Sequence, residues 1–260
     1  MAAIPQPLNN PQTRAELSVR HSGAEGSKIS GRVEQASQGL QAVSRPSLFS
    51  GISPGDYSRI AAAGRIKEFE RGEMLYWDDD PIKQVFLLVS GLVKTTQVGM
   101  SGAEVILGLS GPGDVLGAIS LVSSGRHSRS AKAFRLCRVL AWDASTFKGL
   151  VQSYPALYQN MTRIMGAYLL ELEERFREVA TERVGPRVAR QLVRLGEQIG
   201  QLVEGEVDLG LSREDLAQMT GTTLFTVSRL LCAWEAQGWV RCGRETVTIR
   251  KVESLRAISK

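Results

Sequence analysis

The spacing of apolar residues changes abruptly at Tyr154-Pro155. Before this point, short apolar runs are separated by glycines, as in QVFLLVSGLVKTTQV, or alternate with polar residues, as in SAKAFRLCRVLAWD. After it, apolar residues recur at every third or fourth position for about seven turns. The first pattern is typical of short strands and the second of an amphipathic helix. The chain must therefore fold as a β domain followed by helices.

The β domain is predicted to span residues 46–153. Its short strands are punctuated by turns such as Ser90-Gly91 and the Gly-Pro-Gly-Asp stretch at 111–114. Many short strands with glycine turns, within about 100 residues, indicate a small antiparallel barrel or roll. We therefore expect an α+β chain that begins with an antiparallel β-roll.

Residues 1–45 differ in composition from the rest of the chain. They are rich in Ala, Gln, Ser, Gly, Asn and Pro, and such a segment cannot bury enough apolar surface to become ordered. We expect a disordered arm, and a role in binding DNA or a partner stays open. The chain has neither a secretory signal nor a run of about 18 apolar residues, so we expect a cytoplasmic protein without a membrane partner.

Residues 154–182 are predicted to form one long helix that joins two copies of the chain. Its apolar stripe has the near-heptad spacing of helices that pack against another helix. The alternative is that the same stripe packs on the chain's own β domain. The predicted dimer seam consists of Met161, Ile164, Tyr168 and Leu172.

Residues 183–260 contain two short helices joined by a tight turn at Gly221. Ser212 begins the first helix, with Asp215 in place of the usual acid of a capping box. Thr223 is predicted to cap the second helix, whose residues Val227, Leu231 and Trp234 point inward. This arrangement is a helix-turn-helix, and the two short strands that follow Gly238 predict a wing.

The outward face of the second helix is predicted to read DNA with its first two turns. Arg229 carries the donors that suit a guanine edge or a phosphate, and Phe225 suits a thymine methyl group. Hydroxyl side chains and basic wing residues suit phosphates. The predicted DNA contacts are Thr222, Thr223, Phe225, Thr226, Ser228, Arg229, Arg241 and Arg244.

Other classes of site find little support in the residues. The three cysteines show no paired spacing and there are only two histidines, so neither disulfides nor a metal site is expected. No catalytic motif is present, and we do not expect an enzyme. The net charge of +5 includes 12 basic and 9 acidic residues in 183–260, a modest excess that indicates a polyanion only weakly.

From Leu48 to Ile249 the order of elements and the local motifs resemble the Crp/Fnr superfamily of bacterial transcription regulators. LSREDLAQMTGTTLFTVSRLLCAWEAQGWV resembles its helix-turn-helix, VFLLVSGLVKTT its sensor strands, and GPGDVLGAISLV the entry to its cyclic-nucleotide cassette. The resemblance implies a cupin-like, cyclic-nucleotide-binding-like sensor, a dimerisation helix and a winged helix-turn-helix. It also implies a homodimer on palindromic double-stranded DNA, with RNA polymerase as a further partner. The alternative is a ligand-binding regulatory subunit whose C-terminal domain contacts a protein.

Several departures from the family pattern concern the effector. Gly117 is followed by Ala118 where cAMP-binding members have a glutamate, while Arg129-Ser130 resembles the pair that holds the cyclic phosphate. We therefore expect an effector pocket at Gly117, Ala118, Arg129 and Ser130, but the departures weigh against cAMP. No cysteine precedes Cys137, which argues against an iron-sulfur cluster. Haem stays open, with His127 as the candidate ligand on a loop expected to be exposed. No cofactor is evident.

Overall fold

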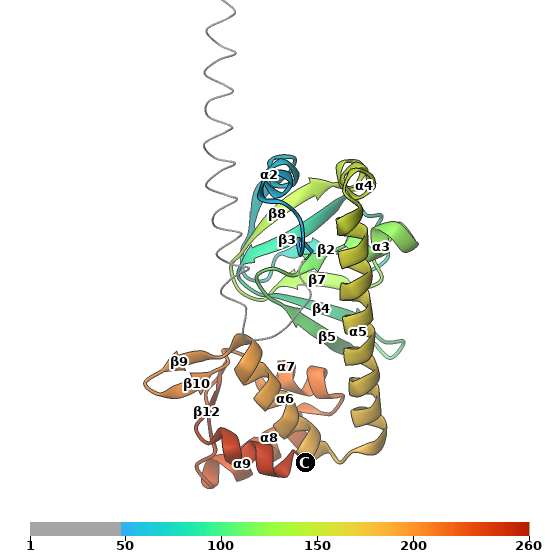
Figure 1. Ribbon diagram of the computed structural model, residues 1–260. Helices are drawn as coiled ribbons and strands as arrows, with labels where there is room; N and C mark the ends of the chain where they lie inside the picture. Colours follow the sequence, from blue (N-terminus) through green and yellow to red (C-terminus); the bar gives the residue numbers. More distant parts are fainter. Residues whose placement is uncertain (1–47, 260) are drawn as a thin grey trace, which may run out of the picture.

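The computed structural model describes residues 48–259, in which a β domain, one long helix and a helical domain follow one another (Figure 1). The predicted α+β fold, with its β-roll, long helix and winged helix-turn-helix, is confirmed. The predicted disordered arm at 1–45 lies outside the described residues. No helix within residues 48–259 combines the length and the apolar character that a membrane span requires.

The β domain consists of two four-stranded antiparallel sheets, in the orders β1-β8-β3-β6 and β2-β7-β4-β5. Its strands are Arg65–Phe69 (β1), Met74–Tyr76 (β2), Gln84–Ser90 (β3), Val93–Val98 (β4), Glu104–Ser110 (β5), Val115–Leu116 (β6), Ser130–Ala133 (β7) and Cys137–Asp143 (β8). Its helices are Pro54–Ala62 (α2), Ala118–Ser123 (α3) and Ala144–Ser153 (α4). Side chains of both sheets, among them Phe86 of β3, Val139 of β8 and Val93 of β4, fill the space inside the roll.

The turn between β3 and β4 depends on Gly91. Its φ of +95° lies in the left-handed region, and a Cβ there would stand 2.2 Å from the carbonyl oxygen of Leu136. We expect Gly91→Ala to lower the free energy of unfolding by about 2–4 kcal/mol, from backbone strain and from overpacking. Gly102→Ala is the matched control, because Gly102 has a φ of +80° and open space around it. If the two variants lose equal stability in denaturant titrations, the close approach to the carbonyl oxygen of Leu136 contributes nothing.

The long helix α5 spans Pro155–Thr181, 27 residues, and its N-terminal part belongs to the β domain. Leu157 and Met161 are buried in the cluster around Trp142 and Phe147. Asn160, also buried, donates to the carbonyl oxygens of Leu48 and Ser50, each at 2.8 Å. These contacts fix the rotation of α5 about its own axis.

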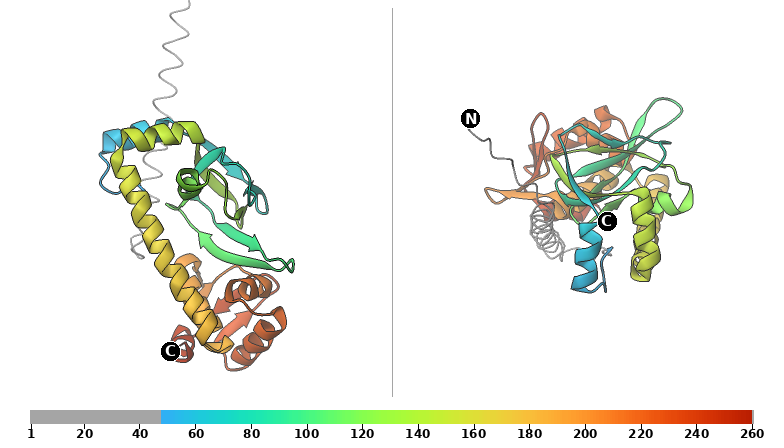
Figure 2. Two further views of the ribbon diagram at one scale, coloured as in Figure 1. Left: turned by 90° about the vertical axis from the view of Figure 1, so that its right-hand side faces the viewer. Right: turned by 90° about the horizontal axis from the view of Figure 1, so that it is seen from above.

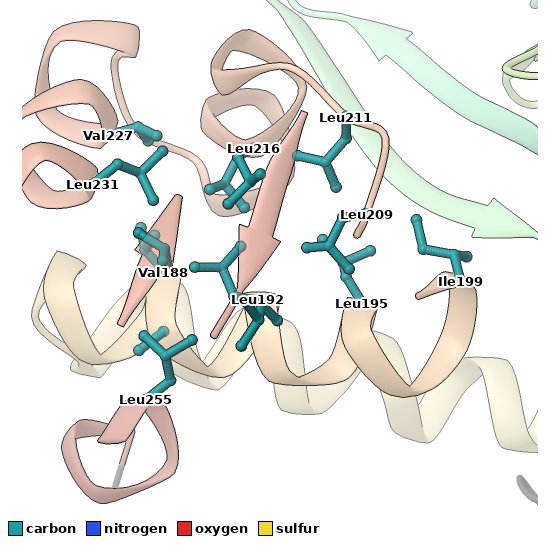
Figure 3. Close-up of a cluster of buried hydrophobic side chains, with 14 of the residues drawn as sticks. Val188, Leu192, Leu195, Ile199, Leu209, Leu211, Leu216, Val227, Leu231 and Leu255 are labelled. Atoms are coloured by element: carbon teal, nitrogen blue, oxygen red, sulfur yellow. The ribbon is translucent and has the colours of Figure 1, made fainter. Parts of the chain in front are cut away.

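The C-terminal domain consists of four helices and a small sheet. Its helices are Val184–Ile199 (α6), Arg213–Thr220 (α7), Leu224–Ala236 (α8) and Val252–Ile258 (α9). Its sheet, in the order β11-β12-β10-β9, contains Gln201–Val203 (β9), Glu206–Asp208 (β10), Val240–Cys242 (β11) and Val247–Ile249 (β12). Side chains of α6, α7, α8 and α9 meet in one apolar cluster (Figure 3). This cluster holds α8 in place while its opposite face stays at the surface.

The two domains contact each other beside α5 (Figure 2). Leu92, Leu109 and Phe134 of the β domain belong to the same apolar cluster as the C-terminal core. Lys94 pairs with Asp215 of α7 at 3.4 Å, and Arg135 donates to the carbonyl oxygen of Leu209 at 3.0 Å. The helical domain is thereby held against the sensor sheet through apolar and polar contacts.

Candidate nucleic-acid interface and sensor site

The turn between α7 and α8 is built as the sequence predicts. Ser212 and Asp215 form a reciprocal capping box at the start of α7. Gly221 ends that helix with a φ of +59°, and Thr223 Oγ1 then accepts a hydrogen bond from Thr226 N at 3.2 Å. The predicted caps are thus confirmed, and they fix which residues of α8 face outward.

Helix α8 has one buried and one exposed face. Val227 and Leu231 are fully buried and Trp234 nearly so, whereas Phe225 is 75% exposed. Arg229, one turn beyond Phe225, is exposed as well, and it forms no hydrogen bond or ion pair with any residue in 48–259. The guanidinium of Arg229 is therefore free to bind an external acceptor.

Three of the four predicted hydroxyl contacts are less accessible than Phe225 and Arg229, while Thr223 is exposed. Thr222, Thr226 and Ser228 are half-buried, and the hydroxyls of Thr226 and Thr223 lie 3.0 Å apart. The geometry gives both threonines a structural part in starting the helix. Whether any of the three contacts a phosphate stays a prediction.

The wing places its basic residues in different environments. Glu206 of β10 pairs with Arg241 at 3.1 Å and with Arg250 at 2.7 Å, so Arg241 already has an acidic partner. Arg244 lies at the exposed turn between β11 and β12 and has no ion pair within the described chain. Of the two predicted wing contacts, only Arg244 is free as the structure stands.

Leu224 and Cys232 were not among the predicted contacts but share the outward side of α8. Leu224 is 46% exposed at the first helical position, and Cys232 is an exposed free thiol near the middle of the helix. The helical period that exposes Phe225 and Arg229 also places Cys232 outside, so the signal was present in the sequence.

The four predicted pocket residues have partners within the protein itself. Gly117 has a φ of +84° and precedes α3, whose first residue, Ala118, is buried. Arg129 donates to the hydroxyl of Tyr168 on α5, and Ser130 Oγ accepts from Asp78 N at 3.0 Å. A shallow cavity of about 430 Å³ lies elsewhere, against β1 and β2. The structure thus links Arg129 to the long helix.

His127 is buried, and the expectation of an exposed loop histidine is wrong. Its ring stacks on Tyr76 with centroids 3.5 Å apart and an interplanar angle of 7°. The structure shows no donor set for a metal: within residues 48–259 no group of three or more His, Cys, Asp or Glu side chains is placed to hold one. The side chains of residues 48–259 therefore do not fit an iron-sulfur cluster. The stacking of His127 on Tyr76 gives no support to His127 as a haem ligand.

Burial lowers the pKa of His127, and the nearby Asp80 carboxylate opposes this shift only partly. The unfolded chain binds the proton near pH 6.5, whereas the folded protein binds it at a lower pH. Stability from this residue is therefore present above about pH 6.5 and falls as the pH drops toward the folded-state pKa. We expect His127→Phe to lose less stability than the unchanged protein between pH 7 and pH 5, in denaturant titrations at both values. Parallel losses would contradict this.

Three of the four residues of the predicted dimer seam make contacts within the single chain. Met161 is 5% exposed and Ile164 packs against the β-domain core, while Tyr168 is bound to Arg129. The fourth residue, Leu172, remains 39% exposed. Five of the exposed apolar residues of α5 lie one row further round the helix and are Tyr158, Met165, Leu169, Leu172 and Phe176; Leu170 and Val179 are exposed as well. In this row the separations of seven, four, three and four follow a heptad pattern, and Figure 2 shows α5 along one edge of the molecule.

Comparison with known proteins identifies both domains. The cyclic nucleotide-binding domain family matches residues 66–154, and the Crp-like helix-turn-helix domain family matches residues 186–258. A CRP-like cAMP-activated global transcriptional regulator of Mycobacterium tuberculosis is 25% identical over 215 residues, 82% of this chain and 96% of that protein. The global nitrogen regulator of Synechococcus elongatus is 30% identical over 171 residues, 64% of this chain and 77% of that protein.

The fold comparison agrees with these relatives. The structure of FixK2 from Bradyrhizobium japonicum superimposes with a TM-score of 0.66 and 24% identity, over 76% of this chain and 98% of that one. At this identity the likeness establishes the shared fold, while the two sequence families establish the kind of domain.

Proposed function

The chain belongs to the Crp/Fnr superfamily of DNA-binding transcription regulators, and on that premise we propose that it binds a palindromic duplex as a homodimer through α8. The observation that carries this proposal is the exposed, unpaired Arg229 beside exposed Phe225 on one helix face. A buried opposite face holds the helix rigid, which is what a recognition helix in the major groove requires.

The dimer is supported by α5. Its exposed heptad row of apolar residues has no partner within residues 48–259, and a second copy presents an identical row. A two-fold axis along this row would place two α8 helices on successive major grooves, and the half-sites would lie about one helical turn apart.

We assign direct DNA contacts to Phe225, Arg229 and Arg244, with Ser228 and the helix start at Thr222 and Thr223 near the phosphates. Arg241 joins them if a phosphate displaces Glu206. Thr226 is retained as a residue that positions the helix start. RNA polymerase is the partner proposed for the DNA-bound dimer, in the cytoplasm.

The β-roll is proposed to modulate DNA binding through Arg129. An anionic effector would compete with Tyr168 for the Arg129 guanidinium and so change a contact made by α5 itself. Such a ligand acts only if it prefers one of two arrangements of the helical domains. We do not propose cAMP as this effector, because Ala118 lacks the carboxylate that would bind a ribose hydroxyl.

Selection from random duplex DNA by the purified protein tests the function. It is run at physiological salt without added ligand, and winning sequences are then titrated against salt, since phosphate contacts release counterions. A palindrome with half-sites one helical turn apart supports the proposal. No enrichment, with or without cyclic nucleotides and cell extract, would favour a C-terminal domain that contacts protein.

A further inference from the structure

The outward face of α8 is unusually apolar for a surface that meets DNA. Phe225 is 75% exposed and Leu224 is 46% exposed, and both lie in the first turn of the helix. Neither packs in the apolar cluster on the other side of α8. Moving either side chain from water into contact with an apolar group of a partner would be favourable.

The same face holds none of the amide or carboxylate side chains that read adenine or cytosine. Adenine is read by Asn or Gln, and the cytosine amino group by Asp or Glu. From Leu224 to Ala236 the only such residue is Glu235, in the last turn, whose carboxylate accepts from Cys242 N at 2.8 Å. Direct readout by α8 is thus restricted to the guanidinium of Arg229, hydroxyls and apolar surface.

The single apolar mark in the major groove is the thymine methyl group. Resting on the proposed function, we propose that Phe225, aided by Leu224, reads thymine methyl groups beside a guanine bound by Arg229. Phe225 and Arg229 are four residues apart on one face, so their Cβ atoms lie about 5–6 Å apart. Base pairs rise about 3.4 Å each. The thymine therefore lies one or two base pairs from the guanine.

The test replaces thymine by uracil, which removes the methyl group and keeps the pairing. Affinities of the full-length protein are measured on the selected palindrome, and on duplexes with uracil at the thymines next to the guanine. Losing one buried methyl is worth about fourfold, so we expect about fourfold for one half-site and roughly fifteenfold for both. The control is a duplex with uracil in the spacer between the half-sites, for which the affinity should not change.

Two variants tie the effect to the side chain. In Phe225→Ala the uracil penalty should shrink to less than twofold, whereas Phe225→Leu should keep most of it. Because Phe225 is exposed, both variants should melt like the unchanged protein. A selected site without thymine within two base pairs of the guanine, or one indifferent to uracil, overturns this inference alone. Failure to enrich any sequence overturns the proposed function as well.

Discussion

Glutamate at both Leu169 and Phe176 is expected to convert the protein from a dimer into a monomer. The two side chains are 53% and 75% exposed in the single chain, so the substitutions leave its own core intact. In the dimer they would place carboxylates of the two copies opposite one another in an apolar seam. Burying an unpaired charge costs several kcal/mol, and the two substitutions place four such charges in the seam of the dimer.

Sedimentation velocity at micromolar concentration measures the outcome directly. Leu170→Glu is the matched control, because Leu170 is 67% exposed but lies roughly 100° away from Leu169 on the helix. A protein that stays dimeric with glutamate at 169 and 176 would place the interface elsewhere. Met161 is unsuitable for such a test, since a charge there would enter the β-domain core.

Arg229→Ala is expected to weaken specific DNA binding by about 1–3 kcal/mol per half-site, and twice that on the palindrome. Arg229 has no partner within the described chain, so its removal leaves no buried group unsatisfied and the fold should not change. The preference for guanine at one position should be lost along with the affinity. Binding curves on the selected palindrome and on its guanine-substituted forms measure both effects.

Arg59→Ala serves as the control for Arg229. It removes the same charge from α2 in the β domain, where Arg59 makes only an exposed ion pair with Asp56 at 3.3 Å. If both variants lose affinity equally at low salt and neither does at high salt, Arg229 contributes only general electrostatic attraction. A loss confined to Arg229→Ala, persistent in salt, identifies a base contact.

The recognition helix was readable from the sequence because local signals agree there. The Ser212–Asp215 cap, Gly221 and the Thr223 cap fix where the two helices begin and end. Between them the 3.6-residue period decides which side chains face inward. Once Val227, Leu231 and Trp234 are known to be buried, the exposure of Phe225 and Arg229 follows without any long-range information.

The rotation of α5 about its own axis could not be predicted from the sequence in the same way. The helix carries two apolar rows roughly a quarter turn apart, one with Met161 and one with Met165 and Leu169. Both rows have helical spacing, so the pattern cannot say which one meets the β domain. The packing of Leu157 and Met161 around Trp142, together with the bonds of Asn160, decides it.

Partners far apart in the chain account for the remaining differences. His127 is buried by stacking on Tyr76, and Arg241 is paired by Glu206 from another strand. Arg129 reaches Tyr168, 39 residues away. The sequence by itself determined the order of elements, the helix caps and the outward face of α8, because these depend on neighbours within a few residues. Only the tertiary structure decided which apolar row of α5 stays exposed, which arginine stays unpaired and that His127 is buried, because each depends on what distant segments bring to it.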